Sequence, residues 1–379
     1  MSADFGIRLR ALLADRGVSL RATARALNYD VAYLSRVVNG RQRPSAQLAE
    51  ALDEFLQTDG ELSEIAAPKS LCLPSAEPSD RSSDVAHMKG SATYLLKHAD
   101  RYGADAVAPA AVQVWRSAQR RLDAGEIPDR ELRGYLSAVS EAAEVAGWLL
   151  FDAGERESAR RAFLESHMLA RHAGDRSKQW FALDMLGMLD NECGRPGEAR
   201  RIAEEILSQR RLAPRVALMA RVRRGGAFAK IGDRKRALAD LDTARRGLEE
   251  SLSPRDPEWA WWVNQDQVAG HTGHALMRLG DAGAALSEIH SALEYAMPRG
   301  VTPRGLMFYH IELLRIYATA KAWRDAEEEI HTISPLLDII SSGRNRLLLR
   351  GALGVVERTP GVPVGLSALV GDTVAAIAL

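Results

Sequence analysis

Apolar residues recur every three or four positions along most of this 379-residue chain, which is the period of helices that bury one face. Runs of β-branched residues, which favour strands, are rare. Residues 4–57 have the pattern of short helices joined by brief turns, and residues 91–358 have a helical pattern almost throughout. The sequence therefore predicts an all-α fold with almost no sheet.

The helical period breaks between Thr58 and Gly90, where Ser, Pro and Asp are frequent. This composition is typical of a linker, and 379 residues exceed what a single hydrophobic core usually holds. We therefore predict two helical domains separated by a linker. The predicted segments are a small domain at 1–57, the linker at 58–90, a long helical domain at 91–358 and an apolar tail at 359–379 that docks onto it.

One spacing occurs five times within the long helical domain. In each copy, a residue that ends one helix stands five positions before an Ala of the next helix. The pairs are Gly154 with Ala159, Gly194 with Ala199, Gly232 with Ala237, Gly280 with Ala285 and Lys321 with Ala326. Twelve positions before these Ala residues stand Gly147, Gly187, Gly225, Gly273 and Leu314. Such regularity predicts internal repeats.

The spacing has a physical explanation. A Gly at a helix C-terminus adopts the left-handed conformation that ends the helix, and small residues on both helices let the two backbones approach closely. Apolar residues such as Phe163 and Leu241, four positions after the Ala, would pack between them. From about Ser140 to Leu336 the pattern resembles the tetratricopeptide repeat, with longer copies than that family has. The resemblance implies a right-handed α-solenoid, to which residues 91–135 add one more helical pair.

Near the N-terminus, the segment that starts at Ser19 has the features of a short helix followed by a tight turn. Ser19 is suited to cap a helix that ends at Leu27. Ala24 is small where two crossing helices must nearly touch. Asn28 stands in the turn, and Asn tolerates the left-handed conformation better than other non-glycine residues do.

A second short helix is predicted at residues 31–38, with Leu34 and Val37 facing the core and Asn39 at its end. A further helix is expected at residues 46–57. Together these features resemble the helix-turn-helix of the phage-repressor type, the XRE family. The alternatives are a solvated face of an ordinary helical bundle and a degenerate helix-turn-helix that serves only dimerisation.

The resemblance implies that the second helix enters the major groove of DNA. Arg36 would read guanine through a bidentate contact, while Ala32 and Tyr33 would face outward and offer apolar contacts. Arg21 and the turn after the second helix would hold phosphates, which position a protein without specifying sequence. The predicted DNA contacts are Arg21, Ala32, Tyr33, Arg36, Asn39, Arg41 and Arg43.

The densest aromatic cluster of the chain comprises Trp259, Trp261 and Trp262 and is followed by polar residues. It could line a ligand groove, and packing between repeats is the simpler alternative. The predicted effector contacts are Asn191, Trp261, Asn264 and Gln265. His271 and His274 have the spacing of two metal ligands, but no third ligand is near them in sequence, which favours a surface or packing role.

Composition narrows the function classes. Lys and Arg balance Asp and Glu over the whole chain, whereas residues 1–57 carry eight Arg against six acidic residues. Cys72 and Cys193 are too few for a disulfide framework, and the N-terminus lacks the apolar run of a signal peptide. No catalytic motif and no membrane-spanning run is present. We therefore expect a cytoplasmic protein that is not an enzyme and uses no cofactor or metal.

A phage-repressor head followed by tetratricopeptide-like repeats resembles the peptide-sensing regulators that Gram-positive bacteria use in quorum sensing. The resemblance implies a homodimeric transcriptional regulator that binds double-stranded DNA and holds a signalling peptide in its repeats. In one alternative, the repeats bind a protein partner or a small molecule. In another, they are a scaffold without an effector in a plasmid or phage maintenance protein. The Ala-, Arg- and Gly-rich composition favours an actinobacterial source.

Overall fold

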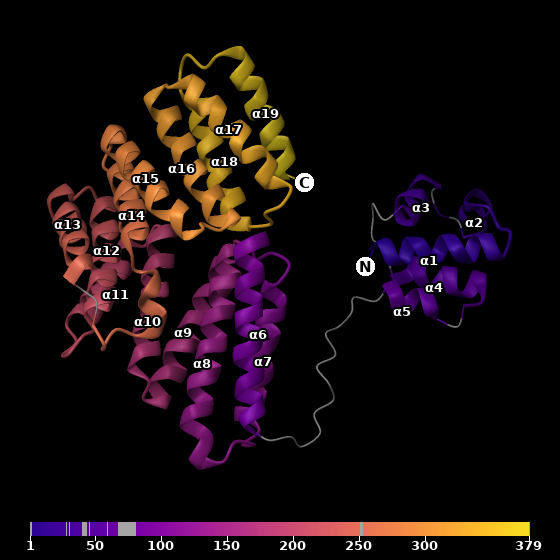
Figure 1. The fold of residues 1–379 in the computed structure, drawn as a ribbon, viewed down its shortest axis with the longest axis horizontal. Helices are drawn as coiled ribbons and strands as arrows, with labels where there is room; N and C mark the ends of the chain where they lie inside the picture. Colours follow the sequence, from indigo (N-terminus) through magenta and orange to yellow (C-terminus); the bar gives the residue numbers. More distant parts are fainter. Residues whose placement is uncertain are drawn as a thin grey trace. The chain divides into compact units, whose positions relative to one another are not determined.

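The structure is a computed structural model that describes the chain apart from short gaps. The described residues are 2–27, 29, 31–39, 44, 46–58, 60–66, 81–250 and 253–378. They form helices and no strand, which confirms the all-α prediction. The chain divides into two compact units, Met1–Ser79 and Asp80–Leu379, whose helices are labelled in Figure 1.

The smaller unit is a bundle of short helices. They are α1 (Ser2–Asp15), α2 (Leu20–Ala26), α3 (Val31–Val38), α4 (Ala46–Leu56) and α5 (Glu61–Ala66). Leu9, Leu34 and Leu52, from α1, α3 and α4, are completely buried in one shared core. Gly6 lets α1 approach α3 closely, because a side chain there would collide with the backbone carbonyl of Val38. Close backbone contact and a common apolar core therefore hold this unit together.

Helix α5 belongs to this bundle, so the linker expected at residues 58–90 is wrong at its start. Asp53 accepts a hydrogen bond of 2.8 Å from the backbone N–H of Leu62 and thereby satisfies the first turn of α5. Arg8 of α1 forms an ion pair with Glu61 of α5, with 2.6 Å between Nε and Oε1. Both contacts reach residues outside the segment, so its local composition does not reveal them.

The expected linker is also wrong at its end, because α6 (Arg81–Tyr102) begins well before residue 91. Met88 and Ala92 of α6 are buried in the core of the larger unit. Their burial accounts for a helix in a segment whose composition suggested none. Residues 67–80 lie outside the described residues.

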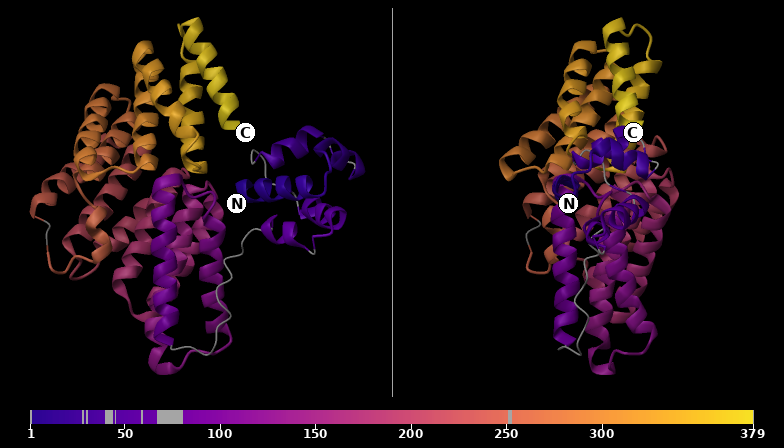
Figure 2. Two further views of the ribbon diagram at one scale, coloured as in Figure 1. Left: turned by 45° about the vertical axis from the view of Figure 1, so that its right-hand side comes forward. Right: turned by 90° about the vertical axis from the view of Figure 1, so that its right-hand side faces the viewer.

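The larger unit continues as a series of helical hairpins, seen from two sides in Figure 2. Its first helices are α7 (Ala108–Asp123), α8 (Asp129–Asp152), α9 (Arg156–Ala173), α10 (Arg176–Glu192), α11 (Pro196–Leu207), α12 (Pro214–Lys230) and α13 (Arg234–Glu250). After the 3₁₀ helix η1 (Glu258–Trp262) come α14 (Gln265–Arg278), α15 (Ala282–Ala296), the 3₁₀ helix η2 (Met297–Arg299), α16 (Pro303–Ala320), α17 (Trp323–Leu337), α18 (Gly343–Arg358) and α19 (Val364–Ala378). Helices α8 to α17 pair consecutively, each even-numbered helix with the next. This arrangement is a helical repeat-like region.

The turn within each of these five hairpins has the left-handed backbone that the spacing predicts. The φ angles are +88° at Gly154, +75° at Gly194, +79° at Gly232, +78° at Gly280 and +58° at Lys321. The five Ala residues that follow are completely buried, namely Ala159, Ala199, Ala237, Ala285 and Ala326. The repeated spacing therefore corresponds to equivalent positions in five hairpins, including the hairpin in which Lys replaces Gly.

Small residues on the first helix of a hairpin make room for apolar residues on the second. A Cβ built on Gly147 would lie 2.6 Å from the ring of Phe163, and one on Gly273 would lie 2.7 Å from Ile289 Cδ1. Phe163 and Ile289 are themselves completely buried. Packing in these hairpins thus depends on the absence of a side chain at the glycine positions.

The C-terminal tail expected at residues 359–379 contains helix α19. Leu366 and Val370 of this helix are each 1% exposed and share a core with α16, α17 and α18. The apolar character of the segment is therefore explained by packing onto the preceding hairpin.

The first helices of the larger unit also lie against its later hairpins, as α6 contacts α16 and α8 contacts α18. Ser341 donates its backbone N–H to the carbonyl of Tyr102 at 2.7 Å. Ser342 Oγ donates to the carbonyl of Asp152 at 3.1 Å. Gly103 permits this contact, because a side chain there would collide with the Ser341 backbone. The hairpins therefore curve until the unit closes on itself.

Candidate functional site

The smaller unit contains the predicted two-helix motif, beginning with α2. Ser19 caps this helix, and its Oγ accepts a hydrogen bond of 3.2 Å from the backbone N–H of Ala22. Ala24 is completely buried where it meets the core. Both observations confirm the local predictions. Asn28 of the turn lies outside the described residues.

Helix α3 has the bounds predicted for the recognition helix. Leu34 and Val37 are completely buried, and Arg36 on the opposite side is exposed. Asn39, just after the helix, is exposed; its Nδ2 donates to the carbonyl of Ser35 at 2.9 Å. The helix therefore presents Arg36 and Asn39 to the solvent, where DNA would lie.

Tyr33 was predicted to face outward, but its side chain is only partly exposed. It is half-buried, packs against the apolar core, and stacks on Tyr29 with ring centroids 6.1 Å apart. The adjacent aromatic ring makes partial burial more favourable than full exposure. Arg21 on α2 is exposed, as expected. The side chain of Ala32 and the residues Arg41 and Arg43 lie outside the described residues.

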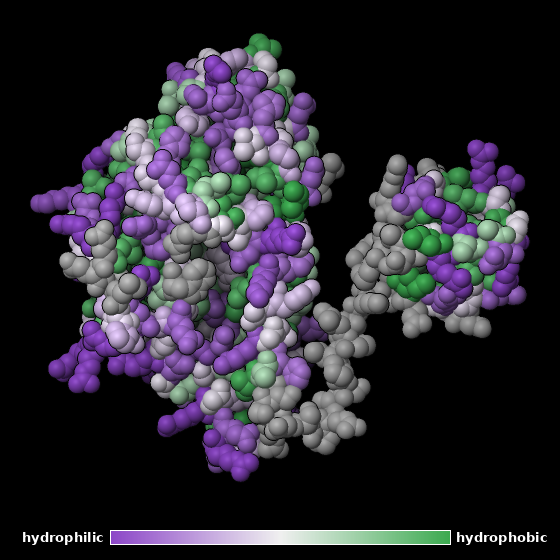
Figure 3. All heavy atoms as spheres, viewed as in Figure 1, coloured by the Kyte–Doolittle hydropathy of each residue, from purple (hydrophilic) through white to green (hydrophobic). Residues whose placement is uncertain are grey.

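The larger unit contains a partly open cavity of about 1020 Å³. Nearly all of its walls come from even-numbered helices, α6 to α18, and from the segment around η1. These helices are the first members of the hairpins, so the cavity lies on one side of the repeat array. In Figure 3 the visible outer face of this unit is mostly hydrophilic.

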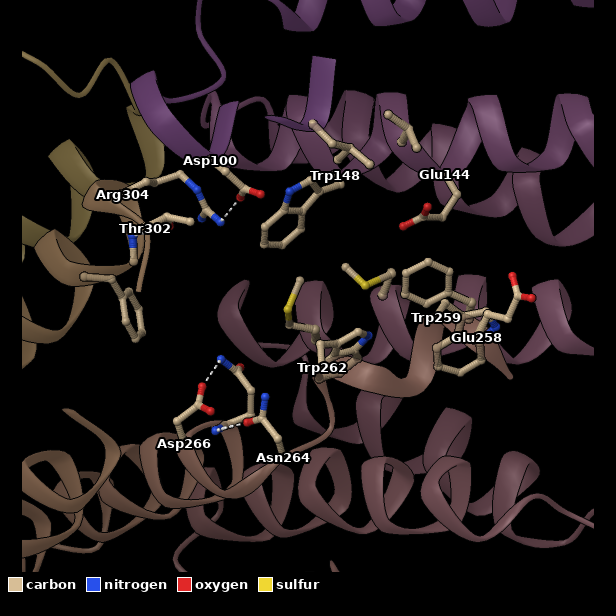
Figure 4. A pocket seen from close by; sticks show the side chains of 18 of the residues that line it. Asp100, Glu144, Trp148, Glu258, Trp259, Trp262, Asn264, Asp266, Thr302 and Arg304 are labelled. Carbon is tan, nitrogen blue, oxygen red and sulfur yellow. Dashed lines mark hydrogen bonds and ion pairs between the residues drawn. The ribbon is translucent and has the colours of Figure 1, made fainter. Parts of the chain in front are cut away.

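Figure 4 shows aromatic residues on two sides of the cavity, with Trp148 on the side of α8 and with Trp259 and Trp262 on a wall across from it. Trp259 of η1 stacks on Phe181 of α10, with 4.6 Å between ring centroids and 9° between ring planes. Its Nε1 donates to Ser177 Oγ at 2.9 Å, which fixes the ring. Trp148 and Trp262 line the cavity as well. This wall is rigid, because Trp259 is held by stacking and by a hydrogen bond.

A buried arginine on α12 stands on another side of the cavity. Arg223 forms a bidentate ion pair with Asp184, with distances of 2.7 and 2.9 Å, and contacts His271 Nε2 at 2.9 Å. Burial, together with the charge of Arg223, lowers the pKa of His271 well below its usual range. His271 is therefore neutral and accepts a hydrogen bond from Arg223. The guanidinium charge is balanced within the protein.

Glu144 of α8 differs from the other buried charged groups. Its side chain is in the cavity lining and 7% exposed, and within the described part of the chain its carboxyl group has no hydrogen-bond or ion-pair partner. Lys178 forms no ion pair with the Glu144 carboxyl group. Its Nζ instead pairs with Glu141 at 2.9 Å and donates to the carbonyl of Ser137 at 3.0 Å. Burial, reinforced by the charge of Glu141, raises the pKa of Glu144 to about 8.

Of the predicted effector residues whose side chains are described, Asn264 lines this cavity, whereas Asn191 and Gln265 do not. Asn264 lines it and also caps α14, accepting from the backbone N–H of Gln267 at 3.1 Å. Gln265 is exposed and lies outside the lining, and its expected effector contact remains a prediction. The side chain of Trp261 lies outside the described residues.

Asn191 is also absent from the cavity lining. Its Nδ2 donates to the backbone carbonyl of Arg223 at 2.8 Å and so ties α10 to α12. The amide donor is therefore used inside the protein, and the expected peptide contact of Asn191 remains a prediction. Glu144 was missed, although a lone acidic residue within an apolar helical stretch, residues 142–151, was a usable signal.

His271 and His274 do not form a paired site. His274 contacts Glu312 at 3.3 Å and stacks on Phe308 with ring centroids 5.6 Å apart, while His271 faces Arg223. Among the described residues no group of three or more His, Cys, Asp or Glu is arranged to hold a metal ion. Each imidazole has its own local partner.

Within the described part of the chain, no helix has both the length and the apolar content needed to cross a membrane. A family model described as a helix-turn-helix domain matches residues 4–64, from α1 into α5. The match includes most of α5, in agreement with the packing of that helix. No curated protein matches the chain. The N-terminal unit is thus a helix-turn-helix domain, and it supports a DNA-binding regulator.

Proposed function

We propose that the protein is a sequence-specific DNA-binding transcriptional regulator that acts by binding rather than by catalysis. The observation that carries the proposal is the helix-turn-helix match at residues 4–64 together with the exposed Arg36 on α3. Arg36 would contact a guanine edge, and Asn39 with Arg41 and Arg43 would hold the backbone. The proposal includes a homodimer, in which two such heads read the two halves of one site.

In this proposal the larger unit binds an effector that controls DNA binding. The support is the cavity of about 1020 Å³, whose lining combines aromatic rings with numerous polar and charged residues. Sites for small molecules typically occupy about 300–1,000 Å³. A cavity of this size suits a compact ligand, whereas the tetratricopeptide resemblance favours an extended signalling peptide.

Selection of binding sites from random duplex DNA by the purified full-length protein tests the proposal. The expected result is an enriched motif with two half-sites, separated by about one helical turn or a multiple of it. Sedimentation of the protein on this DNA should show two chains per site. Failure to enrich any sequence at moderate salt, with the protein folded, would contradict sequence-specific binding.

A further inference from the structure

The carboxyl group of Glu144 is placed where a ligand can reach it but solvent hardly does. The side chain is 7% exposed and belongs to the cavity lining. Figure 4 shows the carboxyl group pointing into the cavity, with Trp148 and Trp259 on either side of the space it faces. A buried carboxyl group without a partner is costly. The carboxyl group is therefore available to pair with a molecule bound in the cavity.

The surroundings of Glu144 favour a positively charged partner. The rings of Trp148 and Trp259 present π faces or edges to the cavity, and Phe181 stacks behind Trp259. Aromatic rings next to a carboxylate attract organic cations, because the ring quadrupole and the negative charge act in the same direction. Glu258, at the start of η1, adds a further carboxylate to the lining, which also contains Asp100, Glu141, Asp175 and Asp266.

The arginines of the cavity do not favour an anionic ligand, because each is neutralised by a protein carboxylate. Arg223 pairs with Asp184, and Arg304 lies 3.3 Å from Asp152. Arg344 likewise pairs with a carboxylate, that of Glu192. Lys178 is held by Glu141. Among the described residues of the lining, Glu144 is a buried carboxylate that forms no ion pair or hydrogen bond with the protein.

We propose that the cavity binds an organic cation with a primary or quaternary ammonium group, which lies against the Glu144 carboxylate and the rings of Trp148 and Trp259. This inference rests on the proposed function in treating the cavity as the effector site. Binding is an exchange of charge: the carboxylic acid of Glu144 loses its proton to solvent, and the carboxylate then pairs with the cation. The raised pKa of Glu144, about 8, fits this exchange, because the empty site holds the proton near neutral pH.

The charged groups that face Glu144 are Glu141 on its own helix and Lys178 and Asp184 on α10. Proton release that disappears in the Glu144→Gln variant therefore identifies Glu144 as its source. A neutral ligand that merely accepts a hydrogen bond from the protonated acid would release no proton.

The test uses the purified full-length protein with matched small probes at millimolar concentration. The probes are 2-phenylethylamine, tryptamine and phenyltrimethylammonium, with 2-phenylethanol and 3-phenylpropionate as the neutral and anionic counterparts. Thermal shift and tryptophan fluorescence report binding, and calorimetry in buffers of different ionisation enthalpy counts protons. We expect the three cations to bind, and about one proton to be released per cation near pH 7. The alcohol and the acid should bind at least about tenfold more weakly than the amines.

Variants separate a ligand contact from a general structural effect. Glu144→Gln should weaken binding of the cations by at least about tenfold and abolish proton release, since the amide cannot ionise. Glu144→Asp keeps a carboxyl group and should retain the proton release. Glu131→Gln changes the same residue type on the same helix outside the cavity lining, and should bind like the unmodified protein.

Equal binding of amine and alcohol, unchanged binding in Glu144→Gln, or no response to any cation would overturn the inference. DNA binding, measured in parallel, separates this inference from the proposed function. If the protein binds DNA sequence-specifically but binds no cation, the inference of a cation site is wrong and the proposed function stands. Cation binding by a protein that selects no DNA sequence contradicts the proposed regulator and leaves the cation site standing.

Discussion

Arg304 of α16 lies 3.3 Å from the carboxylate of Asp152 at the end of α8, and it also lies 3.1 Å from Asp100 of α6. Asp152 is completely buried. Its other carboxylate oxygen accepts a hydrogen bond of 3.2 Å from the backbone N–H of Ala104. The same guanidinium also stands over the ring of Trp148, 5.2 Å from its centroid. One side chain thus joins the beginning and the end of the curved repeat array at the edge of the cavity.

Removal of this arginine should destabilise the larger unit strongly. Arg304→Ala leaves the buried carboxylate of Asp152 without its positive partner, which typically costs about 3–5 kcal/mol. Denaturant unfolding followed by circular dichroism measures the loss. Arg324→Ala is the matched control, because Arg324 pairs with Glu328 while 90% exposed, and should change stability by less than about 0.5 kcal/mol. Equal losses of stability in the two variants would show that the ion pair between Arg304 and Asp152 stabilises the fold no more than an exposed pair does.

Substitutions at two glycines with similar backbone angles separate the cost of disturbing the contact between Gly103 and Ser341 from the cost of local backbone strain. Gly103 has φ +84° and meets the Ser341 backbone, whereas Gly125 has φ +65° and no atom near its missing side chain. Gly125→Ala should cost about 1 kcal/mol for the left-handed backbone. Gly103→Ala should cost clearly more, since the methyl group also displaces the chain before α18. Thermal unfolding compares the variants, and a similar loss in both would argue against closure at this point.

Two arginines of the smaller unit should affect DNA binding differently. Arg36→Ala should weaken binding chiefly to the selected site, by about 1–3 kcal/mol, because a base contact distinguishes sequences. Arg41→Ala should weaken binding to all DNA about equally and reduce the salt dependence by about one phosphate contact. Titrations of selected and random duplexes at several salt concentrations measure both. If Arg36→Ala loses the same affinity for both duplexes, it does not read bases.

The pH dependence of stability should change when Glu144 cannot ionise. Its pKa is about 8 in the folded protein against 4.5 ordinarily, so the folded state holds the proton more tightly. This stabilisation is fully present below about pH 4.5 and is lost as the pH rises to about 8, by about 1.4 kcal/mol per pH unit. Glu144→Gln lacks this loss, so its stability relative to the unmodified protein should increase over that range. Unfolding curves from acidic to alkaline pH test this, and parallel pH profiles would contradict it.

Several local features of the fold could be predicted because they depend on neighbours in sequence. Ser19 caps α2, and α3 begins and ends where its apolar period does. Gly154 and the equivalent residue of the next four hairpins adopt the left-handed backbone. Helical period, capping and the steric freedom of glycine act over a few residues, so spacing alone reveals them.

The sequence by itself therefore determined the helical class, the helix-turn-helix and the register of the hairpins. Only the tertiary structure decided that Arg304 meets Asp152, that Asn191 donates to the backbone of α12, and that Glu144 faces a cavity. Such contacts depend on small rotations between successive hairpins that accumulate along the array. No local spacing records their sum, so residues such as Asp152 and Arg304, far apart along the chain, can be brought together only by the folded protein.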